Sequence, residues 1–137
     1  MMAKQSEGGI KIITTNRKAY HDYHVEDTIE AGIVLTGSEV KSVAAGKASL
    51  TDAYCRVDDG EMWVQNMHIA PYENAGYAQH EPRRKRKLLL HKREIERLRG
   101  KAEQKGYTLI PLKLYFRNGK AKLEIGLVKG KRQYDKR

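Results

Sequence analysis

Five consecutive cations occupy positions 83–87 of this sequence, in the order Arg-Arg-Lys-Arg-Lys. They end a polar stretch, 70–87, that also contains Tyr72, Tyr77 and His80. Cationic side chains bind phosphates and aromatic rings stack on unpaired bases, so this combination is typical of nucleic-acid contact. We therefore expect 70–87 to form a long loop whose basic tip binds RNA or DNA, with a merely solvated charge run as the alternative.

Residues 21–24, His-Asp-Tyr-His, carry two imidazoles and a carboxylate, the groups that metal sites and acid–base catalysts use. In a strand, successive side chains point to opposite faces, so His21 and His24 do not converge on one ion. No third ligand stands out in the pattern. We therefore expect polar histidines on a strand face, and no metal or other cofactor. A hydrolytic enzyme that uses these histidines is kept as an alternative of a different class.

Cys55 is the single cysteine of the chain and falls in an expected strand. A small buried hydrophobe is more common at such a position than a nucleophile. One cysteine excludes an intrachain disulfide framework and suits a reducing compartment, so we expect a cytoplasmic protein. The sequence contains no glycine-rich phosphate loop and no Gly-x-Ser-x-Gly motif. Nothing in it therefore indicates an enzyme.

Glu30 stands between Ile29 and Ala31 in an alternating segment, so its side chain is expected on the face opposite the apolar residues. A merely exposed glutamate is one interpretation. A carboxylate that accepts from a base edge, or orients a basic neighbour, is the other. The pattern alone favours neither.

The charge is divided unevenly along the chain. Residues 1–82 carry 7 Lys and Arg against 12 Asp and Glu, whereas residues 83–137 carry 20 against 5. The net charge of +10 thus combines a part of −5 with a part of +15. An excess of this size indicates a polyanionic partner, nucleic acid before an anionic membrane. The basic part has no Trp and only Phe116, whereas interfacial helices usually carry such anchors.

The elements that must position these residues follow from periodicity and turn chemistry. Tyr20 to Leu35 alternates like a long strand with a bend near Asp27, and part of the leucine run 88–90 is expected in the core. The other expected elements are a short helix from Ser38 closed by Gly46, strands over 54–57 and 62–69 joined by 58–60, a helix over 92–104 stopped by Gly106, and strands over 107–116 and 120–128 turned by 117–119.

This order of short strands predicts a mainly β fold, an OB-fold-like closed antiparallel barrel with two to three flanking short helices. A length of 137 residues fits one domain. We expect a flexible arm over 1–9, an OB-like RNA-binding domain over 10–128 and a basic tail over 129–137. No apolar run approaches the ~20 residues of a membrane span, and no signal peptide is expected.

Several segments together resemble the small protein B (SmpB) family, the SsrA-binding proteins. The most specific are Glu-Ala-Gly at 30–32, Gly-Ser-Glu-Val-Lys-Ser at 37–42 and Arg-Lys-Arg-Lys-Leu-Leu-Leu at 84–90. Others lie at 16–23, 46–48, 105–108, 111–115 and 129–131. The resemblance runs from about residue 10 to the end of the sequence.

The resemblance implies a monomeric protein that binds the tRNA-like domain of transfer-messenger RNA and delivers it to stalled bacterial ribosomes. There it stands in for the anticodon stem and starts trans-translation, which tags the incomplete peptide. A general RNA-binding, ribosome-associated module is the runner-up. The RNA-binding residues implied are Asn16, Arg17, His21, Tyr23, Glu30, Lys41, Arg84, Lys85, Lys87, Leu89 and Lys122. The residues implied for the small-subunit decoding centre are Lys129, Lys131, Tyr134, Asp135, Lys136 and Arg137.

Members of that family usually continue beyond the segment that ends here at Arg137, into a further basic tail that becomes helical in the empty messenger channel. We therefore expect a truncated tail, with a naturally short tail as the alternative. A chain without the extension should keep RNA binding and lose the tail-dependent steps on the ribosome.

Overall fold

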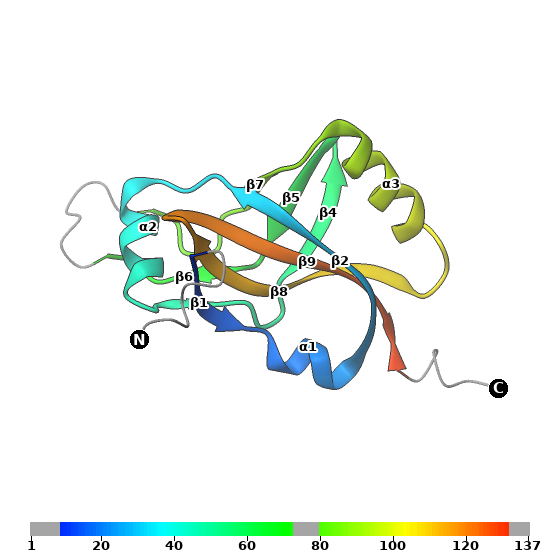
Figure 1. Cartoon of the computed structure of the whole chain (residues 1–137), viewed down its shortest axis with the longest axis horizontal. Coiled ribbons are helices and arrows are strands. Elements are labelled where there is room, and N and C mark those ends of the chain that lie inside the picture. The colour runs from blue at the N-terminus through cyan, green and yellow to red at the C-terminus, as the bar shows by residue number, and fades with distance from the viewer. Residues whose placement is uncertain (1–8, 73–79, 132–137) are drawn as a thin grey trace.

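The computed structural model describes residues 9–72 and 80–131, and it places nine strands and three helices in them (Figure 1). The strands are β1 (Ile10–Thr15), β2 (Tyr23–Ile33), β3 (Ala48–Ser49), β4 (Tyr54–Asp58), β5 (Glu61–Gln65), β6 (His68–Ile69), β7 (Arg86–Leu89), β8 (Tyr107–Arg117) and β9 (Lys120–Gly130). The helices are α1 (Arg17–Asp22), α2 (Gly37–Ala44) and α3 (Lys92–Ala102).

The main sheet closes on itself. Its strands pair in the order β8-β4-β5-β7-β2-β9, all antiparallel, and β9 pairs again with β8. β4 pairs with β8 at Leu109, near the start of β8. β1 pairs with the second half of the same edge of β8, over residues 113–117. The expectation of a mainly β, OB-like closed fold with flanking helices is confirmed.

Two tight hairpins make up much of this ring, and each turns on two residues with positive φ. Asp59 and Gly60 (φ 56° and 77°) join β4 to β5, and Asn118 and Gly119 (φ 51° and 80°) join β8 to β9. Such turns match the twist of the flanking strands. Both loops are one residue shorter than expected, because Asp58 still pairs with Glu61 and Arg117 with Lys120.

The expected strand over 62–69 is split in two. β5 ends at Gln65, and Asn66 adopts φ 63°, a left-handed conformation that breaks the extended chain. β6 then pairs with β3 in a separate two-stranded sheet. The prediction of one continuous strand was wrong here.

The long strand predicted from Tyr20 begins only at Tyr23, because the preceding residues form α1. The Asn16 side chain caps this helix by accepting from the backbone N–H of Ala19 at 3.1 Å. From Tyr23 onward the prediction holds, and the register shifts between Val25 and Asp27, where a bend was expected. β1 was not predicted.

α2 and α3 lie toward opposite ends of the strand layer in Figure 1, with α1 below it. Thr36 is the N-cap of α2, and its side chain and that of Glu39 form a capping box. α3 buries Ile95 and Leu98 against the barrel, as its spacing predicted. Within the described residues, no helix is long and apolar enough to cross a membrane.

The barrel interior is packed with aliphatic side chains, among them Met62, Val64, Leu88 and Leu123. Cys55 belongs to this core, and burial raises the pKa of its thiol far above the usual value. An inert buried cysteine was the expectation, and the structure confirms it.

Candidate nucleic-acid interface

The basic run is not the tip of a loop, because its last two residues open β7. This strand pairs with β5 on one side and β2 on the other. Its side chains alternate, so Arg86 and Leu88 face the interior while Lys87 and Leu89 face outward. Register therefore divides the run into cations that stabilise the fold and cations that face solvent.

Arg86 and Glu39 form the centre of a buried polar cluster, and both side chains are fully buried. Arg86 Nε donates to Glu39 Oε2 at 2.8 Å, and its other nitrogens donate to backbone carbonyls of residues 67, 81, 82 and 84. Arg84 donates to both oxygens of the same carboxylate, at 2.9 and 2.7 Å. A buried guanidinium is tolerated here because its donors are occupied.

Burial of the Glu39 carboxylate favours its neutral form, but hydrogen bonds from Arg84, from the Thr36 backbone and from Arg86 outweigh this effect. They lower the pKa of Glu39 to about 2. The Gly-Ser-Glu motif of α2 and the basic run thus meet in one cluster. Arg84, an expected RNA contact, is instead bound to Glu39 with its side chain one-third exposed.

Lys85 and Lys87 remain on the outer surface. The Lys85 ammonium lies 4.4 Å from the centroid of the Trp63 ring and 3.6 Å from an Asp58 carboxylate oxygen. Lys87 lies 3.7 Å from a Glu61 carboxylate oxygen. Pairs this exposed contribute little to stability, so both ammonium groups are available to a stronger anionic partner.

Leu89 projects from the same outer face and is 54% exposed. It lies opposite Gly32 of β2, which in turn pairs with Lys122 of β9. A side chain at Gly32 would bring its Cβ within 3.3 Å of the Leu89 Cβ, so the glycine leaves space for this leucine. Hollows of about 310 and 360 Å³ lie beside Leu89, and Lys122 lines both.

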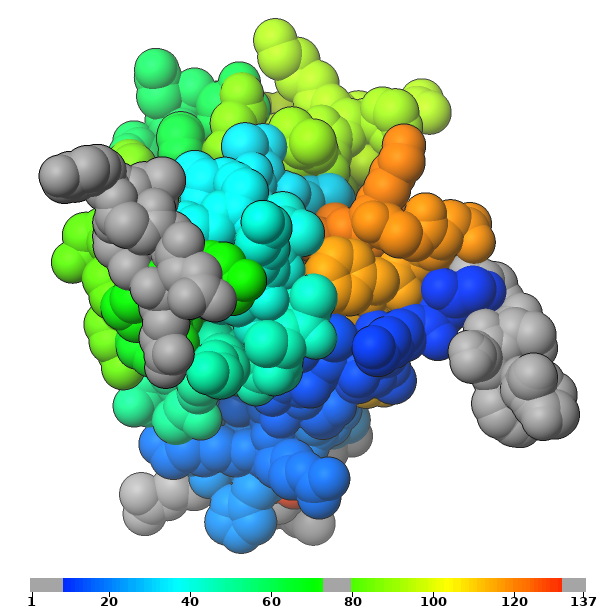
Figure 2. Space-filling view, turned by 90° about the vertical axis from the view of Figure 1, so that its left-hand side faces the viewer, coloured from blue at the N-terminus to red at the C-terminus, as the bar shows by residue number. Residues whose placement is uncertain are grey.

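The larger surroundings of the first hollow are visible in Figure 2, where α2 (cyan) lies beside the β8–β9 hairpin (orange). Val40 of α2 and Phe116 of β8 line this hollow together with Leu89. Val40 is itself exposed. An exposed apolar floor with lysines at its rim fits a sugar or base between phosphates.

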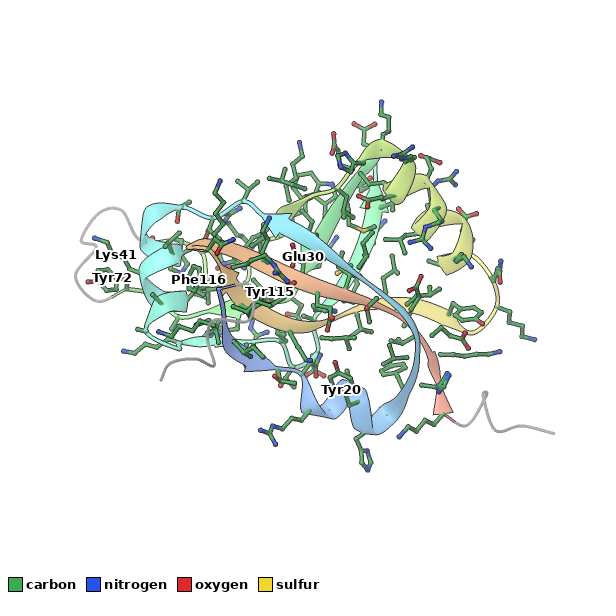
Figure 3. All side chains as sticks on the ribbon, in the orientation of Figure 1. Tyr20, Glu30, Lys41, Tyr72, Tyr115 and Phe116 are labelled. Atoms are coloured by element: carbon green, nitrogen blue, oxygen red, sulfur yellow. The ribbon has the colours of Figure 1, made fainter. Side chains whose placement is uncertain are left out.

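Glu30 points outward on this face, as its parity predicted (Figure 3). Its carboxylate accepts from the Tyr115 hydroxyl at 2.5 Å and from Arg117 Nε at 2.9 Å. Partial burial works to raise the pKa of Glu30, but the bonds from Tyr115 and Arg117 lower it overall. The carboxylate therefore orients a basic neighbour, one of the two roles expected. We call Glu30, Leu89, Tyr115, Arg117 and Lys122 the Leu89 surface.

A second group of expected residues lies at the other end of the β2–β9 pair. Tyr23 pairs with Gly130 there. It lies nine residues from Gly32, a path of ~30 Å along β2 at the usual rise per residue. Arg17 and His21 of α1 are exposed at this end, and Tyr23 is half-buried. A hollow of about 740 Å³ is lined by His21, Tyr23 and Lys131, whereas Arg17 at the start of α1 does not line it.

Asn16 and Lys41 belong to neither group. Asn16 is 5% exposed, and its amide donates to the carbonyls of Leu50 (3.3 Å) and Pro111 (3.0 Å). It anchors α1 and is no longer expected to touch RNA itself. Lys41 is exposed on α2, with its ammonium 5.6 Å from the Tyr72 ring centroid.

The histidines of 21–24 are separated by the helix–strand boundary. His21 Nδ1 lies 2.9 Å from its neighbour Asp22, and His24 lies 3.7 Å from Glu26. Across residues 9–72 and 80–131, no three His, Cys, Asp or Glu side chains come together in a way that would hold a metal ion.

The expected tail residues are only partly described. Lys129 is the last residue but one of β9, with its ammonium 5.2 Å from the Tyr107 ring centroid, and Lys131 is exposed just after the strand. The arm over 1–8 and residues Tyr77, Tyr134, Asp135, Lys136 and Arg137 lie outside the described residues.

Sequence reasoning missed Tyr115 and Arg117, the partners of Glu30, and also Trp63 beneath Lys85. Glu30 is separated from its partners by 85 and 87 residues. The alternation of β8 places Tyr115 and Arg117 on one face, but only the β2–β9–β8 register brings that face to Glu30.

Comparison with known proteins gives a consistent result. The model of a family described as SmpB protein matches residues 13–137. Proteins curated as SsrA-binding protein are 63% identical in Acidothermus cellulolyticus, over 96% of this chain and 82% of the relative, and 57% identical in Caldicellulosiruptor bescii, over 100% and 87%. A chain in a structure described as "tmRNA-SmpB: a journey to the center of the bacterial ribosome" is 56% identical with a TM-score of 0.75, over 90% of this chain and 87% of that one.

Proposed function

The chain belongs to the SmpB protein family, and we propose that it binds the tRNA-like domain of transfer-messenger RNA and carries it to stalled bacterial ribosomes. There it stands in for the anticodon stem while trans-translation tags the incomplete peptide. It acts in the cytoplasm as a monomeric RNA-binding protein rather than as an enzyme.

The Leu89 surface is the observation that carries this proposal. It combines an exposed leucine, a carboxylate held by Tyr115 and Arg117, and the ammonium of Lys122 on one barrel face. Lysines hold phosphates, an apolar side chain packs on a sugar or base, and a fixed carboxylate accepts from base amino groups. Lys87 extends the same outer face of β7, and Lys85 precedes it by two residues, whereas Lys41 of α2 is a separate expected contact beside Tyr72.

The opposite end of the β2–β9 pair suits a second contact. His21, Tyr23, Lys129 and Lys131 lie where β9 ends and the tail begins, and Arg17 is exposed at the start of the adjoining helix α1. We assign Lys129, Lys131 and the rest of the tail to the ribosomal decoding centre. Arg17, His21 and Tyr23 are assigned to contacts with the transfer-messenger RNA. Cations at the two ends of the β2–β9 pair allow one small protein to bridge an RNA and the ribosome.

Equilibrium binding tests the RNA half of the proposal. The labelled tRNA-like domain should bind more tightly than an unrelated RNA duplex of equal length, and log K should fall steeply with log salt. Lys122→Gln should reduce the magnitude of the salt slope by ~0.7–0.9, the value for one phosphate contact. Lys105→Gln removes an equal charge from an exposed turn and serves as the control.

Equal affinity for both RNAs would instead favour a general RNA-binding, ribosome-associated module. A translation reaction stalled on an mRNA without a stop codon tests the ribosomal half. Added protein should carry labelled transfer-messenger RNA onto the stalled ribosomes, measured by sedimentation, and tight RNA binding without RNA on the ribosomes would restrict the protein to RNA binding.

A further inference from the structure

Trp63 and Arg56, which lie beside Lys85 and Lys87 on the outer face of the barrel, have no role in the function described so far. Trp63, the single tryptophan of the chain, projects outward from β5 between two buried residues. Arg56 of β4 is its cross-strand neighbour on one side and Lys87 of β7 on the other. An aromatic ring therefore stands between two cations in one row across three strands.

Within the part of the chain that the structure describes, the cations in this row, and Lys85 above its tryptophan, form no buried contacts. Lys85 lies over the Trp63 ring and pairs with Asp58 between side chains that are 47% and 49% exposed. Arg56 is exposed, and no residue within 9–72 or 80–131 forms a hydrogen bond or ion pair with its guanidinium. Exposed pairs and cation–π contacts of this kind are easily exchanged for phosphate contacts.

The row is continuous with the Leu89 surface. Lys87 and Leu89 share the outer face of β7, and Trp63 is the cross-strand partner of Lys87. Leu89 is thus a diagonal neighbour of Trp63, at a backbone separation of ~7–8 Å. An RNA strand that lies on Leu89 and Lys122 reaches Trp63 without leaving the barrel.

We propose that Trp63, Arg56 and Lys87 form a stacking site for an unpaired base of the same RNA that binds the Leu89 surface. The base takes the ring face that Lys85 covers, and Lys85 turns with Arg56 to the flanking phosphates. This site rests on the proposed RNA-binding function and extends the interface across β7 to β5 and β4. Stacking on an aromatic ring tolerates any base, so the site adds affinity more than sequence preference.

The single tryptophan makes the proposal directly measurable. Addition of the unlabelled tRNA-like domain should quench Trp63 emission with the same midpoint as binding followed by a label on the RNA. Free N-acetyltryptophanamide at the same RNA concentrations corrects for absorbed light. A titration in which the labelled RNA binds while Trp63 emission stays unchanged would overturn the stacking site and leave the proposed function standing.

Variants provide a second readout. Trp63→Leu should weaken RNA binding by about 5- to 100-fold, whereas Trp63→Phe keeps a ring and should lose less. Arg56→Gln should lower the magnitude of the salt slope by ~0.7–0.9, and Lys105→Gln serves again as the control. Thermal melts establish that each variant folds; if Trp63→Leu does not, the phenylalanine variant and the quenching titration decide.

Equal affinity of folded Trp63→Leu and the unchanged protein for the RNA would refute the site. Failure of the unchanged protein to bind the RNA at all would refute the proposed function instead. The two failures are therefore distinguishable.

Discussion

Replacing Arg86 by methionine removes the guanidinium from the buried cluster while keeping an apolar stem of similar length. Glu39 then retains Arg84 and the Thr36 backbone N–H, and the carbonyls of Met67 and Pro82 each lose the guanidinium donor. Removal of one partner from a buried ion pair costs ~3–5 kcal/mol, because the other charge stays buried without compensation. We expect the melting temperature to fall by ~10–20 °C for a domain of this size.

Lys87→Met is the matched control for this experiment. Lys87 is the next residue of β7, and its replacement removes the same charge. Its ammonium is exposed and forms a surface ion pair with Glu61 at 3.7 Å. We expect a loss below ~1 kcal/mol from it. Thermal and urea unfolding of both variants measure the difference.

RNA binding should show the opposite order in its salt dependence. Lys87→Met should lower the magnitude of the slope by ~0.7–0.9, whereas folded Arg86→Met should leave it unchanged because Arg86 touches no phosphate. An unchanged melting temperature for Arg86→Met would refute the assignment of a stabilising role. So would equal destabilisation by the two substitutions, because burial would then not distinguish the cations.

Three further predictions concern single carboxylates and the core. Because the pKa of Glu39 is lowered to about 2 in the folded chain, its contribution to stability is present above about pH 4.5 and lost as pH falls toward 2. Glu39→Gln should flatten that part of the acid unfolding curve. Glu30→Ala should weaken RNA binding with little change in thermal melting, since Glu30 is exposed; marked unfolding would contradict its placement. Leu98→Ala should cost ~2–5 kcal/mol in urea unfolding because Leu98 is 2% exposed, and an unchanged midpoint would place it outside the core.

Local signals were sufficient for the parts of the fold that depend on near neighbours. Asp59-Gly60 and Asn118-Gly119 adopt positive φ in both hairpins, as their residue types indicate. The spacing of Ile95 and Leu98 predicted α3 and its buried face. The alternation of β2 predicted an outward Glu30.

Prediction from local sequence failed where contacts with residues distant in the sequence decide the secondary structure or the burial of a side chain. β1 carries no clear alternation, and Ile12 is 53% exposed, so only pairing with β8 makes the segment a strand. α1 interrupts an apparent strand pattern because Ala19 packs against the buried residues of β8 and β9. Charged runs are usually solvated, and no local rule predicts a fully buried Arg86.

The sequence by itself determined the charge asymmetry, the hairpins, the helix α3 and the motifs that carry the family resemblance. Only the tertiary structure decided which cations are available to RNA. Arg86 enters the interior because Glu39, 47 residues away, is buried beside it and accepts its hydrogen bond. Lys87, Leu89 and Lys122 share one outer face because antiparallel register places β7, β2 and β9 side by side. Register between distant strands is a property of the whole sheet, and it is not encoded in the spacing of residues along one segment.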